Sequence, residues 1–245
     1  MNDVAWSAML ALAKGDDAAA PEQSAVARSL APLVEAKRGG TPLVVAQLGQ
    51  SLDGRIATPT GDSKGINNLV AMTHLHRLRA LVDAVVVGAG TARADNPRLT
   101  VRHCIGESPV RVVIDPNGTV RPDAEVWRGD DGVGRIVFGG NRNLSSDVDR
   151  IALPDGELRP DWIIDALGER GLSRLLIEGG GKTVSHFLER QAIDYLHLLF
   201  APVIIGSGPV GLNLPAIGSL EQATRPVSDV HLFESGDVLY ACRLK

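Results

Sequence analysis

Three consecutive glycines, Gly179–Gly181, follow the acidic Glu178 and precede Lys182 in the stretch LLIEGGGKTVSHFL. The letters GGGKT resemble the end of a nucleotide-binding P-loop, but that motif needs a glycine five positions before Gly181, where this chain has Leu176. Glycines let backbone N–H groups approach an anion closely, and the start of a following helix favours negative charge. We therefore favour a phosphate-binding turn of another kind over a simple loop.

A second glycine turn, VVVGAGTARAD, carries Gly88 and Gly90 in a G-x-G pattern. Arg93 occupies the position where a dinucleotide fingerprint has Gly or Ala, so a plain tight turn explains this pattern about as well. The next residues, RADNPRLTVR, place Arg93, Arg98 and Arg102 within ten positions. Guanidinium forks suit phosphate, although a solvated charged loop is the alternative for any one arginine.

A third polar segment, QSLDGRIATPTGDSKG, gathers Asp53, Arg55, Asp62 and Ser63 after the first expected strand. An α/β sheet binds ligands at the carboxyl ends of its strands. We expect all three segments to converge at that edge.

Composition narrows the class of protein. The chain has 245 residues, a net charge of −4 and 4% aromatic residues, which argues against nucleic acid as a partner. No apolar run approaches the roughly 20 residues of a membrane span, and the N-terminus carries an acid where a signal peptide has basic residues. Cys104 and Cys242 are far apart and are expected to be reduced thiols. His74 and His76 are two positions apart on an expected helix and cannot share a face, so no metal site is expected. We expect a cytoplasmic protein.

Elements that position these residues alternate between apolar strands and helices from Pro42 onward. Strands are expected in PLVVAQL, DAVVVGAG, VRVVIDP, RIVFGG and SRLLIEGGG, and helices in NLVAMTHLHRLRALV, PDWIIDALGERG and TVSHFLERQAI. The first of these helices carries an apolar stripe at Leu69, Met72, Leu75, Leu78 and Val82. DYLHLLFAPVIIGSG and VHLFESGDVLYACRL read as returning strands, so a mostly parallel sheet should finish antiparallel, with helices on both faces. Residues 1–40 form a helical extension broken at KGDDAAAPEQ, and residues 41–245 form one catalytic domain.

Six segments together resemble the reductase domain of bacterial riboflavin biosynthesis enzymes and its archaeal and fungal stand-alone relatives. They are SLDGRIA, TGDS, LRALVDAVVVGAGTARADNPRLTVR, PVRVVIDP, IEGGG and APVIIGSG, in the family's order, from about Leu43 to the C-terminus. The resemblance implies a dihydrofolate-reductase-like α/β fold and NADPH as cofactor. It also implies reduction of a 5-phosphoribosylamino-pyrimidine, such as 5-amino-6-(5-phosphoribosylamino)uracil, to its ribitylamino form, with a hydride to C1′ and a proton to the nitrogen.

The resemblance also suggests roles for individual positions. Cofactor contacts are expected from Gly49, Thr58, Asp62, Thr91, Asp95, Gly180, Gly181, Lys182 and Thr183, joined by Gly88 and Gly90 of the second glycine turn. Substrate contacts are expected from Ser63, Arg79, Leu99, Arg102 and Glu178, with Arg79 and Arg102 clamping the 5′-phosphate. Asp53 and Glu178 are the candidates for placing or relaying the proton, with water as the alternative.

Three features depart from the family pattern. The chain has no H-x-E with P-C-x-x-C, so we expect the reductase step without deamination. Gly65 replaces a tryptophan usual after TGDS-x and GINN replaces ITS, while residues 1–40 have no family counterpart. Two alternatives stay open: the same fold and cofactor acting on another heterocycle such as a pterin, or a non-catalytic nucleotide-binding homologue that docks through residues 1–40. The family also implies a homodimer through the C-terminal strands.

Overall fold

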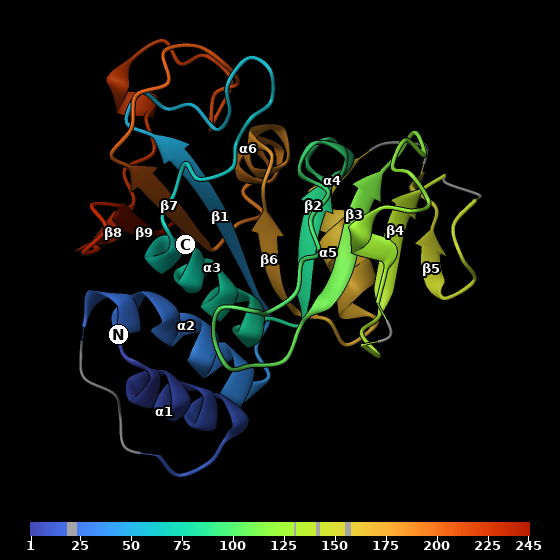
Figure 1. Cartoon of the computed structure of the whole chain (residues 1–245), viewed down its shortest axis with the longest axis horizontal. Helices are drawn as coiled ribbons and strands as arrows, with labels where there is room; N and C mark the ends of the chain where they lie inside the picture. Colours follow the sequence, from blue (N-terminus) through green and yellow to red (C-terminus); the bar gives the residue numbers. More distant parts are fainter. Residues whose placement is uncertain (19–23, 130, 141–142, 155–157) are drawn as a thin grey trace.

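One nine-stranded sheet lies at the centre of the fold in the computed structural model, which describes residues 1–18, 24–129, 131–140, 143–154 and 158–245 (Figure 1). The strand order is β5-β4-β3-β2-β6-β1-β7-β9-β8. Neighbours from β5 to β7 pair in parallel, and β9 is antiparallel to both β7 and β8. The predicted mostly parallel sheet with antiparallel C-terminal strands is confirmed. The strands are β1 Leu43–Ser51, β2 Ala84–Gly88, β3 Val110–Asp115, β4 Arg135–Gly139, β5 Val148–Ile151, β6 Arg174–Glu178, β7 Tyr195–Ala201, β8 Val227–Leu232 and β9 Val238–Arg243.

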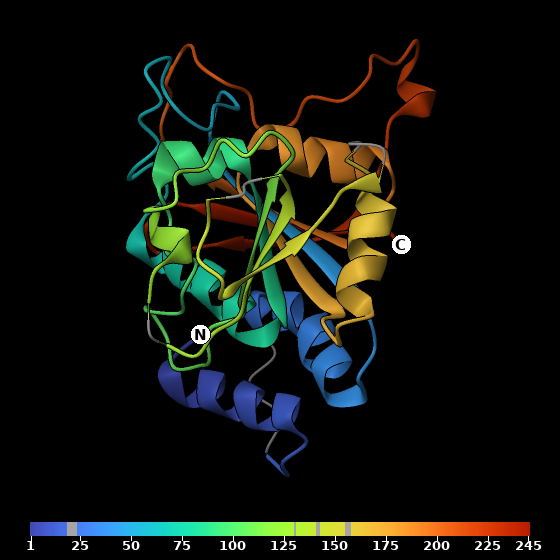
Figure 2. The same ribbon diagram turned by 90° about the vertical axis from the view of Figure 1, so that its right-hand side faces the viewer.

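Helices cover both faces of this sheet, as predicted (Figure 2). Apolar side chains alternate between two cores: Val45 of the first strand packs with the helices of one face, and Val44 and Ala46 pack with those of the other. The helices are α1 Asp3–Lys14, α2 Ala25–Gly39, α3 Leu69–Leu81, α4 Ala89–Asp95, α5 Pro160–Gly168 and α6 Gly181–Glu189, with 3₁₀ turns η1 Glu125–Trp127 and η3 Leu220–Gln222. Within the described ranges, no helix has the length and apolar character needed to cross a membrane.

The apolar stripe predicted for α3 is only partly right. Leu75 and Leu78 are buried, but Leu69 at the first position is 65% exposed. Four polar side chains of the same helix are buried instead: His74, His76, Arg77 and Arg79. The helix is covered from several sides, so the 3.6-residue period no longer separates an inner from an outer face.

Two short elements were not predicted from the sequence. Residues of the second glycine turn form α4, whose seven residues AGTARAD include a glycine and show no apolar period. β5 has only two buried residues, Val148 and Ile151, around an exposed centre, so it lacks an apolar run. Both elements are held by neighbouring strands rather than by their own sequence pattern.

Helices α1 and α2 precede the first strand and pack on the α3 side of the sheet (Figure 1). The Asn2 side chain caps α1 and the Ser24 side chain caps α2, while a glycine ends each helix. Lys37 of α2 donates to the Ala80 carbonyl of α3 at 3.1 Å. The predicted break KGDDAAAPEQ includes residues 19–23, which lie outside the described residues.

Candidate active site

Two helix N-termini lie side by side at the carboxyl edge of the sheet. β2 and β6 are adjacent parallel strands; α4 begins directly after β2 and α6 two residues after β6 (Figure 1). Gly88 and Gly180 are their N-cap residues, and no side chain caps either helix. A Cβ at Gly180, where φ is +55°, would lie 2.6 Å from the Thr91 hydroxyl, and one at Gly88 would collide with the Thr183 hydroxyl. The first N–H groups of both helices are therefore left for an anion, and only glycine fits this close approach.

The structure brings Gly88, Thr91 and the Gly180–Thr183 turn together, as the sequence predicted for a cofactor cradle. Gly90 lies in the first turn of α4 with open space around its Cα, and Lys182 is exposed in the first turn of α6. These placements do not by themselves test cofactor binding, which stays a prediction.

The loop after β1 carries the remaining predicted cofactor residues. Thr58 and Asp62 close one turn of this loop, because the Asp62 N–H donates to the Thr58 hydroxyl at 3.1 Å and the Thr58 N–H donates to the Asp62 carbonyl at 2.9 Å. Ser63 then donates to the Asp95 carboxylate at 2.8 Å, which ties this loop to the end of α4. Gly49 lies within β1, and a side chain there would collide with the Asn67 amide oxygen.

A buried ion pair stands beside the cradle. Arg79 of α3 donates through Nε to Glu178 Oε2 at 2.8 Å and through a terminal nitrogen to Oε1 at 2.5 Å, and its other terminal nitrogen donates to the Thr100 carbonyl at 2.9 Å. Glu178 ends β6 directly before the glycine turn. Arg79 therefore positions the predicted catalytic carboxylate, and its fork faces Glu178 rather than an open phosphate site. The phosphate contact of Arg79 stays a prediction.

Arg102 adds a positive charge beside the neutral Arg79–Glu178 pair. Its guanidinium donates to the Thr100 hydroxyl at 2.7 Å, and among the described residues no carboxylate lies within ion-pair distance of it. Burial, followed by the positive charges of Arg79 and Arg98, lowers the pKa of Arg102, and Glu178 opposes this effect. A bound anion would relieve this repulsion.

Leu99 precedes this cluster in a strained conformation. Its φ is +56° although it has a bulky side chain, and it is 1% exposed. Such a conformation persists only where the surroundings fix it, and functional sites are where it is usually found.

Asp53, the other predicted catalytic residue, is held between two loops. Its carboxylate accepts from the Ser51 hydroxyl at 2.6 Å and from the backbone N–H groups of Ile205 and Gly206 at 3.0 and 2.7 Å. These hydrogen bonds, that from Ser51 first, lower the pKa of Asp53 to about 2. The carboxylate therefore ties the loop after β1 to the loop after β7, and its role in placing or relaying the proton stays a prediction.

Sequence reasoning missed three kinds of supporting contact. Thr100 links both arginines of the cluster, and His76 accepts from the Arg102 backbone N–H through Nδ1 at 2.9 Å. No local signal in the sequence indicates the second contact, because His76 and Arg102 are 26 residues apart. The unusual Asn67 and Asn68 both donate to the fully buried Asp237 at 3.0 Å, a partner that nothing local in the sequence indicates.

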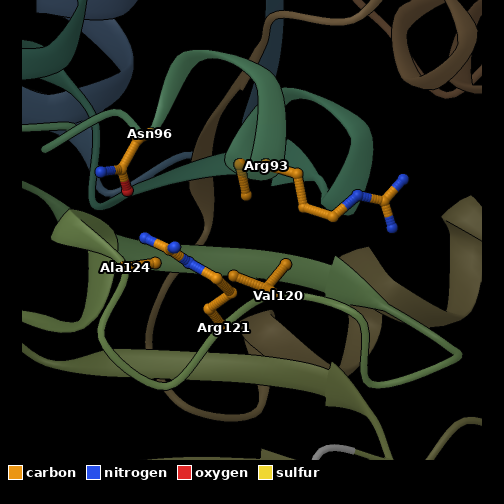
Figure 3. Close-up of a pocket in the computed structure, with 6 residues that line it drawn as sticks. Arg93, Asn96, Val120, Arg121 and Ala124 are labelled. Carbon is orange, nitrogen blue, oxygen red and sulfur yellow. The ribbon is translucent and has the colours of Figure 1, made fainter.

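A pocket of about 320 Å³ lies between α4 and the segment that follows β3. Its lining residues are Ala92, Arg93, Asn96, Val120, Arg121 and Ala124. Figure 3 shows the Arg93 and Arg121 side chains reaching toward different ends of it. Arg121 pairs with Asp123 at 3.2 Å, whereas the Arg93 guanidinium bonds to the neutral Thr119 hydroxyl.

The chain is similar to proteins of riboflavin biosynthesis. The RibD C-terminal domain family model matches residues 42–226. A riboflavin biosynthesis protein RibD from Bacillus amyloliquefaciens is 34% identical over 186 residues, which cover 69% of this chain and 48% of that protein. A 2,5-diamino-6-ribosylamino-4(3H)-pyrimidinone 5′-phosphate reductase from Aquifex aeolicus is 31% identical over 189 residues, covering 72% of this chain and 82% of that protein.

Solved structures agree with these sequence matches. A Thermotoga maritima diaminohydroxyphosphoribosylaminopyrimidine deaminase/5-amino-6-(5-phosphoribosylamino)uracil reductase is 29% identical and aligns with a TM-score of 0.72 over 89% of this chain and 61% of its own. An Acinetobacter baumannii RibD aligns with a TM-score of 0.76 at 26% identity, over 89% of this chain and 63% of its own. The chain thus spans about half the length of its Bacillus relative and less than two thirds of these two structures. From this likeness and the sheet order, the predicted α/β fold with a mostly parallel sheet is confirmed, and the chain belongs to the RibD C-terminal domain family.

Proposed function

We propose that residues 41–245 form an NADPH-dependent reductase that converts a 5-phosphoribosylamino-pyrimidine to its ribitylamino form in riboflavin biosynthesis. The observation that carries this proposal is the placement of an uncapped helix pair directly beside the Glu178, Arg79 and Arg102 cluster. The pair of helix N-termini suits a dinucleotide pyrophosphate, and the guanidinium of Arg102 suits a sugar phosphate. The reactions for which the Aquifex and Thermotoga relatives are named support the same assignment.

Binding roles follow from this geometry. The Gly180–Thr183 turn, with Gly88, Gly90 and Thr91, holds the pyrophosphate, and the loop tied to Asp95 covers the nicotinamide end of the cofactor. We expect Gly49, Thr58 and Asp62 to contact the cofactor. Ser63 and the backbone of Leu99, whose side chain is buried, are expected to contact the substrate. When bound, the nicotinamide supplies a hydride to C1′ of the ring-opened sugar.

The polar cluster then orients the substrate. Arg102 binds the 5′-phosphate. Glu178, held by two of the three guanidinium nitrogens of Arg79, accepts from a hydroxyl or ring N–H of the substrate. Asp53 is ionised, so solvent supplies the proton that the substrate nitrogen takes.

The experiment that tests this function follows NADPH oxidation with 5-amino-6-(5-phosphoribosylamino)uracil as substrate. We expect turnover by the wild-type chain and a KM raised about 10- to 100-fold in Arg102→Ala, the range for losing charge-assisted hydrogen bonds. Arg38→Ala, an exposed arginine of α2, serves as the control and should behave as wild type. If the wild-type protein binds NADPH but does not turn over this pyrimidine, the result contradicts the proposed substrate.

Preference for NADPH over NADH is expected to rest on Arg93. This side chain lies on α4, the helix whose N-terminus forms part of the cradle, and it lines the adjacent pocket. Among the described residues no carboxylate lies within ion-pair distance of its guanidinium. We expect Arg93→Gln to weaken NADPH binding about 10-fold and to leave NADH binding unchanged, because only NADPH carries a 2′-phosphate. Arg121→Gln, at the other end of the pocket and already paired with Asp123, is the matched control. Equal weakening of both cofactors contradicts this role.

A second copy of the chain is expected to cover the outer part of the sheet. Val230, Leu232 and Tyr240 are 50%, 67% and 40% exposed, and Val230 pairs directly with Tyr240 across β8 and β9. An apolar surface at an edge strand is typical of an interface. We expect sedimentation to give twice the chain mass for the wild type and the monomer mass for Leu232→Asp. A wild-type monomer at micromolar concentration contradicts the dimer.

The cytoplasm is the compartment that fits this reaction. Cys104 is half-buried and Cys242 is buried, and both are free thiols. Reduced cysteines are typical of cytosolic proteins.

A further inference from the structure

Helix α1 lies outside residues 42–226, which match the family, yet it contacts the loop that carries Arg102. Trp6 is 1% exposed, and its indole N–H donates to the Ile105 carbonyl at 2.8 Å. Lys14, at the other end of the helix, lies 3.6 Å from the Glu107 carboxylate. One face of the loop between Thr100 and Pro109 is therefore held by an element that the family match does not include.

Helix α3 holds the same loop from another side. His76 accepts from the Arg102 N–H at 2.9 Å, and Gly106 packs so closely on Ala80 that a Cβ there would lie 2.5 Å from the Ala80 Cβ. The loop also closes on itself, because the Val101 N–H donates to the Ser108 hydroxyl at 3.0 Å.

The two helices that hold the loop are joined to each other. Arg77 of α3 donates to the Met1 carbonyl at 3.0 Å, and its guanidinium carbon lies 5.5 Å from the centre of the Trp6 ring. Trp6, Arg77 and the loop therefore form one packed unit, and Arg79 and His76 lie on the same helix as Arg77.

We propose that Trp6 is a positioning residue for the substrate phosphate: its hydrogen bond to Ile105 fixes the loop so that Arg102 is ordered before substrate binds. This inference rests on the proposed function, since it takes Arg102 as the phosphate ligand. A loop that is ordered in advance loses less conformational freedom on binding, so affinity for the substrate rises while the chemical step is unchanged. Loss of the indole donor leaves the Ile105 carbonyl without its partner.

The test compares Trp6→Phe, which keeps an aromatic ring but has no N–H, with wild type. We expect the KM for 5-amino-6-(5-phosphoribosylamino)uracil to rise about 3- to 10-fold, in line with one lost hydrogen bond, with kcat within about twofold. The NADPH dissociation constant should not change. Met9→Leu, a volume-conserving change at a buried position of the same helix, is the matched control and should leave the KM unchanged.

Hydrogen exchange of the amides of residues 101–107, measured without any ligand, gives a second result that does not depend on activity. We expect faster exchange in Trp6→Phe than in wild type or Met9→Leu. Unchanged exchange together with an unchanged KM overturns the inference. If the wild type turns over no pyrimidine, the proposed function fails, and exchange alone then decides whether Trp6 orders the loop. Should Trp6→Phe not fold, the surface variant Lys14→Glu, which repels Glu107, must raise exchange in the same loop.

Discussion

Replacing Glu178 with glutamine is expected to lower the free energy of unfolding by about 3 to 5 kcal/mol, the range for removing one partner of a buried ion pair. Arg79 is 4% exposed, and two of its nitrogens donate hydrogen bonds to the two carboxylate oxygens of Glu178. A glutamine side chain offers one acceptor oxygen and turns an NH₂ group toward the other guanidinium donor. The charge of Arg79 then stays buried without a counter-charge, and turnover should also fall below detection.

Urea denaturation of a double-mutant cycle measures this effect. Arg79→Met and Glu178→Leu should each be about as destabilising as Glu178→Gln. The double variant Arg79→Met with Glu178→Leu should be less destabilising than the sum of these two single changes, because no charge remains buried. The exposed pair Arg98 and Glu125 is the control, and breaking it with Arg98→Met should change stability by less than about 1 kcal/mol. A cost below about 1 kcal/mol for Glu178→Gln rules out the buried pair as a main source of stability.

Acid is expected to destabilise the fold already between pH 6.5 and pH 5, through the buried pair His74 and His197. The two rings contact through His74 Nε2 and His197 Nδ1 at 3.0 Å, and both are 1% exposed or less. Burial lowers the pKa of His197 to about 4, and burial, with the charges of nearby groups second, lowers the pKa of His74 well below its usual value. In the unfolded chain both rings titrate near pH 6.5.

The direction in which stability changes with pH follows from the lowered pKa values of the two histidines. Both pKa values are depressed in the fold, so the contribution is fully present above pH 6.5 and is lost as pH falls, because the unfolded chain takes up protons that the folded chain does not. Each histidine contributes up to about 1.4 kcal/mol per pH unit below pH 6.5, so the pair contributes about 2 to 3 kcal/mol per unit at most.

Urea unfolding at pH 7 and at pH 5.5 checks this prediction. The double variant His74→Leu and His197→Leu should have a clearly smaller slope than wild type, although its stability at pH 7 will differ from that of wild type. Part of the pH dependence should remain, because burial also lowers the pKa of His76 to about 3 and lowers the pKa of His231. His103→Gln, which replaces an exposed histidine, should keep the wild-type slope. An equal slope in the double variant and wild type would falsify the assignment to this pair.

Four buried polar side chains of helix α3 contact four different parts of the molecule. His74 contacts β7, His76 holds the Arg102 backbone, Arg77 binds α1, and Arg79 holds Glu178. Substitutions along this one helix should therefore affect stability, substrate affinity and activity separately.

Much of the fold and one part of the site were determined by the sequence alone. Apolar strands ending in glycine or acid predict a sheet with its loops at one edge, because the backbone must bury its polar groups in a ladder and turn where glycine permits. The cradle was predictable for the same local reason: the three glycines at Gly179–Gly181 are tolerated only where the backbone needs close approach or positive φ.

The pairing of charged and polar groups was decided by tertiary structure. Arg79 and Glu178 are 99 residues apart, His74 and His197 are 123 apart, and Asn67 reaches Asp237 across 170. The interaction energy of such groups depends on distance and on the surrounding dielectric, and sequence separation fixes neither. From sequence alone, Arg79 is expected to bind the substrate phosphate and Asp53 to place or relay the proton. Only the packing of α3 and the loops shows that Arg79 also has Glu178 as a partner and that the Asp53 carboxylate accepts hydrogen bonds from Ser51, Ile205 and Gly206.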